Sequence, residues 1–272
     1  MCGLAGIILG NKNRSEDDFE WIKESMTTLL IRSQARGPHA TGIAVIRKDG
    51  SFQLLKRPIP AEEFVETEEY EDLMAEIPAR PDQRKAGGDS EVTIIMGHTR
   101  FRTIGTELVS NNNHPIRAGK IIGTHNGTIY NAAYIADMHG LNRFADVDSE
   151  VLFRVANKFR NPVQFKSKLK DFRGQMTAVM VNINSPNKIR IYKGNKPFAM
   201  QWFDELDIMI YASNSDFFES VESENYATHD YRFKPNRSIQ FNTEKELKMK
   251  VSNFKFKPEV RKKCTGYLFT EH

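Results

Sequence analysis

Side chains in the second half of the chain alternate between apolar and polar with a period of two, and this pattern limits the fold more than any other feature. Such alternation predicts strands that bury one face. The alternating segments are 176–183, 188–192, 207–212 and 248–257. Short apolar runs predict further strands in the first half, at the opening segment up to Leu9 and at 41–47, 51–56, 92–96 and 120–124.

Helical spacing is confined to roughly the first 160 residues. Ser15 and Asp18 form a possible capping box, and apolar residues then recur every three or four positions until a Gly-Pro pair at 37–38. The other helical segments are the acidic stretch 62–76, then 131–138 and 149–159. Strands joined by tight turns, with helices covering their faces, favour an α+β fold of stacked sheets between helical layers.

We expect a single domain over 2–272. The strand pattern continues almost to the C-terminus without a break in composition, and 272 residues can bury a substantial core. Segment 78–90, with two Pro and a Gly-Gly pair, predicts a surface loop rather than a linker, because strand patterns resume directly after it.

Bulk composition excludes several classes of protein. A formal net charge of +4 is too small for a typical nucleic-acid-binding chain. Two cysteines, Cys2 and Cys264, do not make a disulfide framework, and no His/Cys spacing predicts a metal site. The chain has no signal peptide pattern and no apolar run near 18 residues, so we expect a soluble, cytoplasmic protein that binds neither nucleic acid nor membrane.

Charge is unevenly distributed along the chain. Segment 62–76 carries eight acidic side chains and no basic one, whereas 245–263 is mainly basic. Within 248–257 the lysines alternate with apolar residues, which favours a half-buried strand over a nucleic-acid patch. Both segments are candidate docking surfaces, although solvated faces are the simpler interpretation.

Cys2 directly follows the initiator Met1. Removal of Met1, which is usual before so small a side chain, would leave a thiol and a free amine on one residue. A thiol with a pKa of about 8.5 needs a base, and an α-amine with a pKa of about 7.7–8.0 can supply one. The alternative is that Cys2 is only the small apolar start of a buried strand.

Three polar clusters stand next to glycine at the ends of predicted strands, where functional loops usually lie. They are 97–103, 111–115 and 124–131. Each has a simpler interpretation: Asn126-Gly127 could be a hairpin turn, Arg100 a surface ion pair, and His114 a loop histidine with satisfied hydrogen bonds.

Taken with Cys2, these clusters resemble the signatures of the class II glutamine amidotransferases, which belong to the N-terminal-nucleophile hydrolases. The matching motifs occur in the family's order, from Cys2 to Glu150: Cys2-Gly3-Leu4-Ala5-Gly6-Ile7, Arg36-Gly37-Pro38 through Gly42, Gly97-His98-Thr99-Arg100, Asn113-His114-Pro115, His125-Asn126-Gly127 through Asn131, and Asp148-Ser149-Glu150. Beyond Glu150 the likeness is limited to a strand-rich character.

The resemblance implies a four-layer αββα sandwich of two mostly antiparallel sheets. It also implies hydrolysis of the glutamine side-chain amide to glutamate and ammonia through a thioester on Cys2, without cofactor or metal. Arg36 and Gly37 would support the terminus. The Asn126 side-chain amide and the Gly127 N–H would form the oxyanion hole, where one donor contributes about 2.7–4 kcal/mol in other hydrolases.

The same resemblance implies a pocket for the amino-acid head of glutamine. Arg100 would bind the α-carboxylate, Thr103 would add a hydroxyl, and Asp148 would pair with the α-ammonium. His114 would support the pocket wall, and 100–108 would be the loop that closes over the substrate.

The chain departs from the family pattern at Phe101 and Arg102, where relatives commonly carry Trp or Tyr and then a small residue. Closure of the loop is therefore expected to differ.

Members of that family usually join this domain to a second one that uses the ammonia. Here we expect the whole chain to be used in completing the sheets, so we hypothesise a stand-alone glutaminase subunit that delivers ammonia to a partner synthase. One alternative keeps the chemistry but replaces glutamine with a γ-glutamyl amide conjugate. Another keeps the fold as a non-catalytic binding module, although such copies usually lose the nucleophile or the oxyanion donors.

Overall fold

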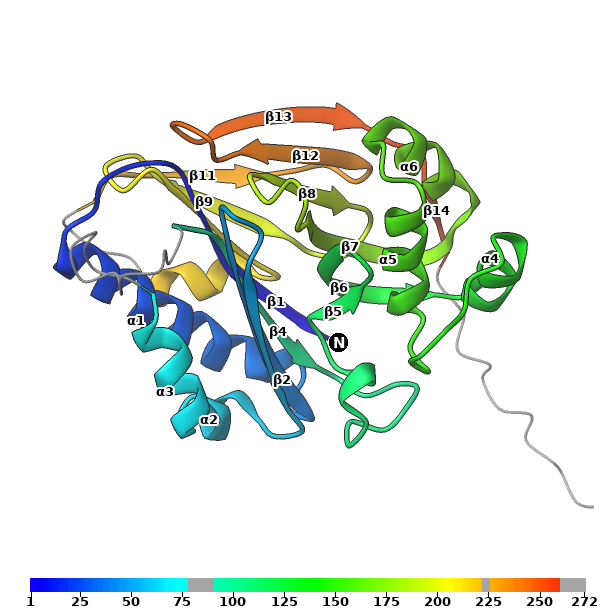
Figure 1. The fold of residues 1–272 in the computed structure, drawn as a ribbon, viewed down its shortest axis with the longest axis horizontal. Coiled ribbons are helices and arrows are strands. Elements are labelled where there is room, and N and C mark those ends of the chain that lie inside the picture. The colour runs from blue at the N-terminus through cyan, green and yellow to red at the C-terminus, as the bar shows by residue number, and fades with distance from the viewer. Residues whose placement is uncertain (78–90, 222–225, 260–272) are drawn as a thin grey trace, which may run out of the picture.

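The computed structural model describes residues 1–77, 91–221 and 226–259. Two β-sheets pack face to face (Figure 1), and in each the spatial order of the strands differs from their order along the chain. The predicted loop 78–90 and Cys264 lie outside the described residues.

The strands of the first sheet, in spatial order, are β11 (Thr228–Arg232), β9 (Ala199–Phe203), β10 (Ile208–Ala212), β1 (Gly3–Leu9), β4 (Val92–Arg100), β2 (Ala40–Arg47) and β3 (Phe52–Arg57). Those of the second are β13 (Lys248–Asn253), β12 (Arg237–Asn242), β8 (Lys188–Lys193), β7 (Arg173–Asn182), β6 (Ile121–Ile129) and β5 (Ile116–Ala118), with β14 (Lys257–Pro258) beside β7. All pairings are antiparallel except that of β14 with β7.

Helices cover the outer face of each sheet. On the first sheet these are α1 (Glu16–Ser33), α2 (Ala61–Phe64) and α3 (Glu68–Ala75); on the second, α4 (Ala132–Met138), α5 (Ser149–Lys158) and α6 (Pro162–Lys168) (Figure 1). This is the four-layer αββα sandwich predicted from the sequence.

Side-chain alternation along β1 shows how the layers are joined. Leu4 and Ile8 belong to the core between the two sheets, whereas Ala5, Ile7 and Leu9 belong to the core under α1. Successive side chains of a strand point to opposite faces, so a continuous apolar run such as β1 can bury both faces of the first sheet.

Some predicted elements need correction. The acidic segment forms two helices rather than one, because Thr67 accepts a hydrogen bond from the Tyr70 N–H and so caps a new helix. The strand predicted over 248–257 ends at Asn253, and Val251 is exposed because β13 lies at the edge of its sheet. Strand β6 continues to Ile129, so Asn126-Gly127 lies within a strand and is not a turn.

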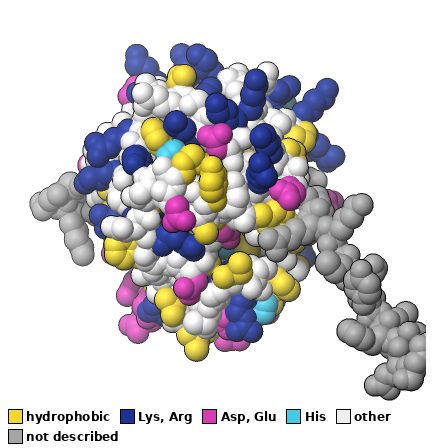
Figure 2. Space-filling view, turned by 90° about the vertical axis from the view of Figure 1, so that its right-hand side faces the viewer, with side chains coloured by type: hydrophobic (Ala, Val, Ile, Leu, Met, Phe, Trp, Pro, Cys, Tyr) yellow, Lys and Arg dark blue, Asp and Glu magenta, His cyan; other side chains and the backbone are white. Residues whose placement is uncertain are grey.

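The charged segments lie on the surface. All eight acidic side chains between Glu62 and Glu76 are exposed, as are Lys248, Lys250, Lys255 and Lys257. Figure 2 shows Lys and Arg gathered on the upper part of the face that carries α6 and β13. In the described parts of the chain, no helix is long and apolar enough to cross a membrane.

The predicted capping box of α1 is confirmed. Ser15 Oγ accepts from Asp18 N at 3.1 Å, and Asp18 Oδ2 accepts from Ser15 N at 2.7 Å. We expect Ser15→Ala to lower the free energy of unfolding by about 0.5–2 kcal/mol, measured by urea denaturation. Glu24→Ala, at an exposed position within the same helix, is the control; equal losses in both variants would contradict a capping effect.

Candidate active site

Cys2 lies directly before β1, a strand held between β4 and β10. Gly3 pairs with Thr99, so Cys2 lies beside Arg100 at the end of β4. The Phe101 N–H points at Cys2 Sγ at 3.4 Å, and the sulfur lies 3.8 Å from the Phe101 carbonyl. In Figure 1 the N-terminus is seen beside the ends of β1 and β4. The sulfur is therefore half-buried against the start of the predicted substrate loop.

Arg36 holds the main chain at Cys2. Its Nε donates to the Cys2 carbonyl at 3.0 Å, and its Nη1 donates to Asn214 Oδ1 at 2.8 Å. Gly37 lets the two segments approach closely, since a Cβ there would lie 2.3 Å from the carbonyl carbon of Arg100. Both residues thus lie where support of the terminus requires them.

Asn126 and Gly127 lie on β6, in the sheet facing Cys2. Asn126 Nδ2 lies 3.5 Å from Ser213 Oγ, which accepts from the Leu4 N–H at 2.9 Å. Gly127 has a φ of +153°, and a Cβ there would lie 1.9 Å from the Gln175 carbonyl oxygen. Only glycine fits the backbone at position 127. Ser213, which contacts both Asn126 and Leu4, links this part of β6 to β1.

Arg100 is buried and anchors the loop that follows it. Its Nη1 donates to Asn113 Oδ1 at 2.8 Å, and its Nη2 donates to the Ile104 and Gly105 carbonyls at 2.7 and 2.8 Å. A guanidinium has five N–H donors, so among the described residues these contacts leave two of them for a ligand. Thr103 is exposed on the same loop.

Asp148 completes the set at the N-terminal end of α5. Its Oδ2 accepts from the Ile129 N–H at 2.5 Å, which ties it to the end of β6. Its negative charge reaches the site: it adds to the effect of burial in raising the pKa of the Cys2 thiol, and it opposes the larger effect of burial, which lowers the pKa of His125. Asp148 and Arg100 therefore bring opposite charges to the neighbourhood of the sulfur.

Burial raises the pKa of the Cys2 thiol, against the opposing effects of the Phe101 N–H, the terminal ammonium and Arg100. The terminal amine, which belongs to Met1 in this structure, has a pKa lowered by burial and by the nearby cations Arg36 and Lys196. The site thus disfavours a spontaneous thiolate and favours an unprotonated amine.

Three buried histidines lie behind the site. His98 Nε2 lies 3.1 Å from the His125 carbonyl, His98 stacks on His114 with ring centroids 4.2 Å apart, and His125 Nδ1 lies 2.8 Å from Ser149 Oγ. Burial lowers the pKa of each, to about 3 for His98. Neutral rings at physiological pH fit a supporting wall, the role that the resemblance implies for His114.

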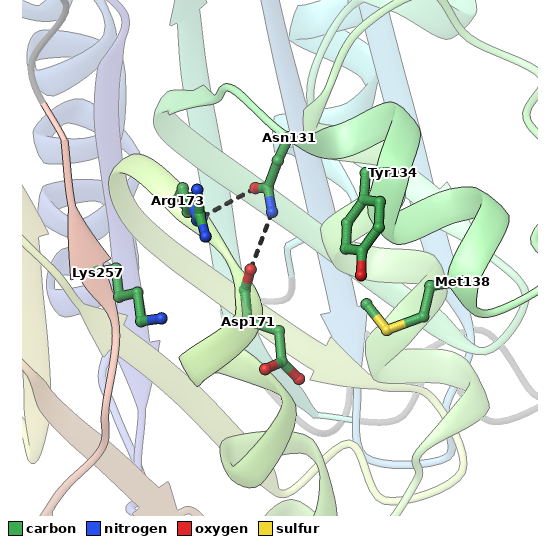
Figure 3. A pocket seen from close by; sticks show the side chains of 6 residues that line it. All are labelled: Asn131, Tyr134, Met138, Asp171, Arg173 and Lys257. Atoms are coloured by element: carbon green, nitrogen blue, oxygen red, sulfur yellow. Dashed lines mark hydrogen bonds between the residues drawn. The ribbon is translucent and has the colours of Figure 1, made fainter.

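Asn131, the last residue of its motif, has contacts outside this group (Figure 3). Its side chain accepts from the Arg173 N–H and donates to the Asp171 carbonyl, both at 2.9 Å. It joins the start of α4 to the start of β7, beside a pocket of about 400 Å³ that Tyr134 and Lys257 help to line. Its contacts are those of a structural link.

Sequence reasoning missed Ser213, Asn214 and Lys196. Ser213 and Asn214 directly follow a predicted strand, the same signal that marked the other polar clusters. Lys196 Nζ lies 3.2 Å from Met1 Sδ, and no motif in the sequence around Lys196 predicts this contact. In the described residues, no group of three or more His, Cys, Asp or Glu side chains is arranged to hold a metal ion.

The two sheets and the helices that cover them have the fold of class II glutamine amidotransferase domains, which confirms the resemblance at the level of the fold. A solved structure of glutamine phosphoribosylpyrophosphate amidotransferase from B. subtilis superposes with a TM-score of 0.61 and 17% identity, covering 93% of this chain and 49% of that one. A structure described as the allosteric regulatory enzyme of purine biosynthesis gives a TM-score of 0.64 at 17% identity, covering 94% and 50%.

Sequence comparison finds curated relatives at low identity. The chain is 26% identical over 229 residues to 7-cyano-7-deazaguanine synthase 2 of Sulfurisphaera tokodaii, covering 81% of this chain and 45% of the relative. It is 25% identical over 236 residues to 7-cyano-7-deazaguanine synthase of Sulfolobus acidocaldarius, covering 85% and 46%. The chain thus spans about half the length of these relatives. No family model matches the sequence.

The buried histidines predict a loss of stability in acid. An unfolded histidine takes up a proton near pH 6.5, whereas the buried rings resist it, so the unfolded state binds more protons as pH falls below about 6.5. Each such ring lowers the free energy of unfolding by up to about 1.4 kcal/mol per pH unit until its folded pKa is reached.

We therefore expect His114→Phe to flatten the decline of unfolding free energy between about pH 6 and pH 4. Neither ring nitrogen of His114 has a hydrogen-bond partner among the described protein atoms, so the substitution breaks no such bond. His229→Gln, whose side chain is 63% exposed, serves as control in the same urea titrations. An unchanged slope in the His114 variant would contradict the explanation.

Proposed function

We propose that the mature protein hydrolyses the side-chain amide of glutamine to glutamate and ammonia, with Cys2 as the nucleophile after removal of Met1. The observation that carries the proposal is the contact of Cys2 Sγ with the backbone of Phe101. That contact sets the sulfur next to Arg100 and within the electrostatic reach of Asp148. A thiol between a carboxylate-binding and an ammonium-binding side chain matches the two ends of a glutamine head.

Chemistry begins with transfer of the thiol proton, through water, to the α-amine of Cys2. The sulfur attacks the amide carbon, and the resulting oxyanion accepts hydrogen bonds from Asn126 Nδ2 and the Gly127 N–H. Collapse of this intermediate returns the proton to the departing nitrogen, releases ammonia and leaves a thioester. Water then attacks the thioester, which yields glutamate and the free thiol.

The electrostatics support the amine as base. Burial, together with Arg36 and Lys196, lowers the pKa of the amine on Met1, and Arg36 is hydrogen-bonded to the Cys2 carbonyl, next to the amine that removal of Met1 would expose. A lowered pKa increases the fraction of such an amine that is unprotonated at a given pH, while burial, which raises the pKa of the thiol, keeps the thiol protonated until the amine takes the proton.

Glutamine is held through its charged groups. An N–H group of Arg100 that its loop contacts leave free binds the α-carboxylate, and Asp148 binds the α-ammonium. Thr103 contributes its hydroxyl when the loop closes, and His114 supports the wall behind Arg100. Arg36 and Gly37 keep the terminus in place, and no metal or cofactor takes part in any step.

Ammonia passes, in this proposal, to a synthase that lies outside the matched segment. The curated relatives are named as synthases, and the match covers less than half of each. A cyano group contains one nitrogen atom, for which ammonia is a chemically competent source. The exposed acidic helices α2 and α3 and the basic strand β13 are candidate docking surfaces for the synthase.

Replacing Cys2 tests the nucleophile. Cys2→Ala should lower kcat for glutamate release by more than about three orders of magnitude, because no other group can form the thioester. Glutamate release is measured on protein whose intact mass shows that Met1 is absent. Cys264→Ala, which changes the chain's other cysteine, should keep full activity; comparable turnover by Cys2→Ala would rule out the mechanism.

Replacing Asn126 tests the oxyanion hole separately from substrate binding. Asn126→Ala should lower kcat by about 10²–10³ with little change in KM, because the lost donor acts only when charge develops on the oxygen. Steady-state kinetics separates the two parameters. A rise in KM at constant kcat would instead assign Asn126 to ground-state binding.

A further inference from the structure

A second pocket, of about 400 Å³, lies beside the nucleophile and is not used by the mechanism. Lys193, Arg232, Asp216, Ser213 and Asn214 all contribute to its lining, together with two phenylalanines. Ser213 and Asn214 are the residues whose side chains contact Leu4 and Arg36. The pocket therefore shares part of its wall with the support of the Cys2 terminus.

Strand pairing fixes how far the pocket is from the reacting groups. Cys2 precedes β1, Ser213 follows the neighbouring strand β10, and Ala199 begins the next strand, β9. Neighbouring strands lie about 4.8 Å apart, so the pocket lining at Ala199, two strands away, is about 10 Å from β1, which Cys2 directly precedes. In the second sheet, Asn126 pairs with Thr177 and Thr177 pairs with Lys193, which sets Lys193 about 10 Å from the oxyanion donor.

Lys193 is the unusual member of this lining. Lys193 is only 6% exposed. Among the described residues its ammonium donates one hydrogen bond, to the Gly194 carbonyl at 3.2 Å. None of the salt bridges among the described residues includes Lys193. A buried charge is normally paired, because removing it from water is costly. Burial accordingly lowers the pKa of Lys193.

Charges around the pocket favour an anion. Lys193 and Arg232 supply two cations, and Asp216 is the one carboxylate that lines the pocket within the described residues. Ser213, Ser215 and Asn214 add hydroxyl and amide donors, which suit the oxygens of a carboxylate or phosphate.

We propose that this pocket binds a carboxylate or phosphate group carried by the molecule that supplies, or the molecule that receives, the amide nitrogen. The inference rests on the proposed glutaminase chemistry for its link to nitrogen transfer. A distance of about 10 Å between the lining at Ala199 and the strand that Cys2 precedes allows an anionic group joined to the transferred nitrogen by several bonds. Two sources are thus open: the amine part of a γ-glutamyl donor, and the acceptor of ammonia.

Binding is tested on the full chain by NMR of backbone amides during titration with inorganic phosphate at constant ionic strength. We expect saturable shifts at Gly194, Ser213 and Ser215, with affinity at least about five-fold weaker in Lys193→Met. Lys250→Met, an exposed lysine on β13, is the matched control and should bind as the parent does. Arg232→Met, at an exposed position, should also weaken binding and covers the case in which Lys193→Met does not fold.

Linear, unsaturated shifts, or equal affinity in the parent, Lys193→Met and Arg232→Met, would overturn the proposal. Because phosphate binding is read without turnover, its outcome is independent of the Cys2→Ala result. A protein that binds phosphate here but hydrolyses no amide would keep the anion site and lose only its assignment to nitrogen transfer.

Kinetics distinguishes the two sources. If the anion belongs to the donor, Lys193→Met should lower kcat/KM for γ-glutamylglycine by about ten-fold relative to γ-glutamyl methylamide and glutamine. If it belongs to the acceptor, all three donors should react as with the parent while phosphate binding is lost. An equal loss for all three donors would show that Lys193 only supports the fold, and would overturn the proposal.

Discussion

The pairing of β1 with β4 and β10 is the constraint on which the candidate site depends. Cys2 has no secondary structure of its own, but Gly3 is already paired with Thr99 and Leu4 is bonded to Ser213. A residue directly before a strand held on both sides has little freedom. The Arg36 guanidinium then fixes the Cys2 carbonyl, so the position of the sulfur follows from the first sheet as a whole.

The second sheet contributes the groups that face this terminus. Asn126 and Gly127 belong to β6, and Asp148 is tied to the same strand through the Ile129 N–H. The candidate oxyanion hole and the candidate ammonium site are therefore both positioned by β6. His98, on β4, adds a further link to β6, since its ring contacts the carbonyl of His125, the residue directly before Asn126. Pre-organised donors of this kind need little rearrangement during reaction.

Local sequence signals predicted the parts of the molecule that depend on neighbours in the chain. The capping box at Ser15 and the apolar run of β1 are of this kind, and both are confirmed. Asn126-Gly127 was ambiguous, because the dipeptide suits a hairpin turn as well as a strand whose glycine adopts a positive φ. Thr67 was not singled out as the residue that divides the acidic helix, because the acidic residues on both sides of it are good helix formers.

Contacts that depend on strand order could not be predicted in the same way. Ser213 comes within reach of the terminus because β10 pairs with β1, and Lys196 does so because the connection between β8 and β9 passes Met1. Lys193 directly follows the predicted strand 188–192, and its burial is visible only once both sheets are assembled. Sequence patterns do not single out residues of this kind, whose neighbours along the chain are ordinary but whose contacts in the folded protein are unusual.

The Arg100 contacts suggest how substrate binding and loop position are linked. Three of its donors hold the Asn113 side chain and the Ile104 and Gly105 carbonyls, so the same guanidinium that would bind a carboxylate also shapes the loop above it. Loop opening would break those bonds and leave a buried cation without its acceptors, which is unfavourable. A ligand carboxylate would supply new acceptors and further stabilise the closed position of the loop.

Phe101 and Arg102, where the sequence departs from the family pattern, lie at the start of this loop, and Arg102 is already paired with Glu107 across it. In the position seen here, the loop is therefore held by an ion pair of its own as well as by the Arg100 contacts.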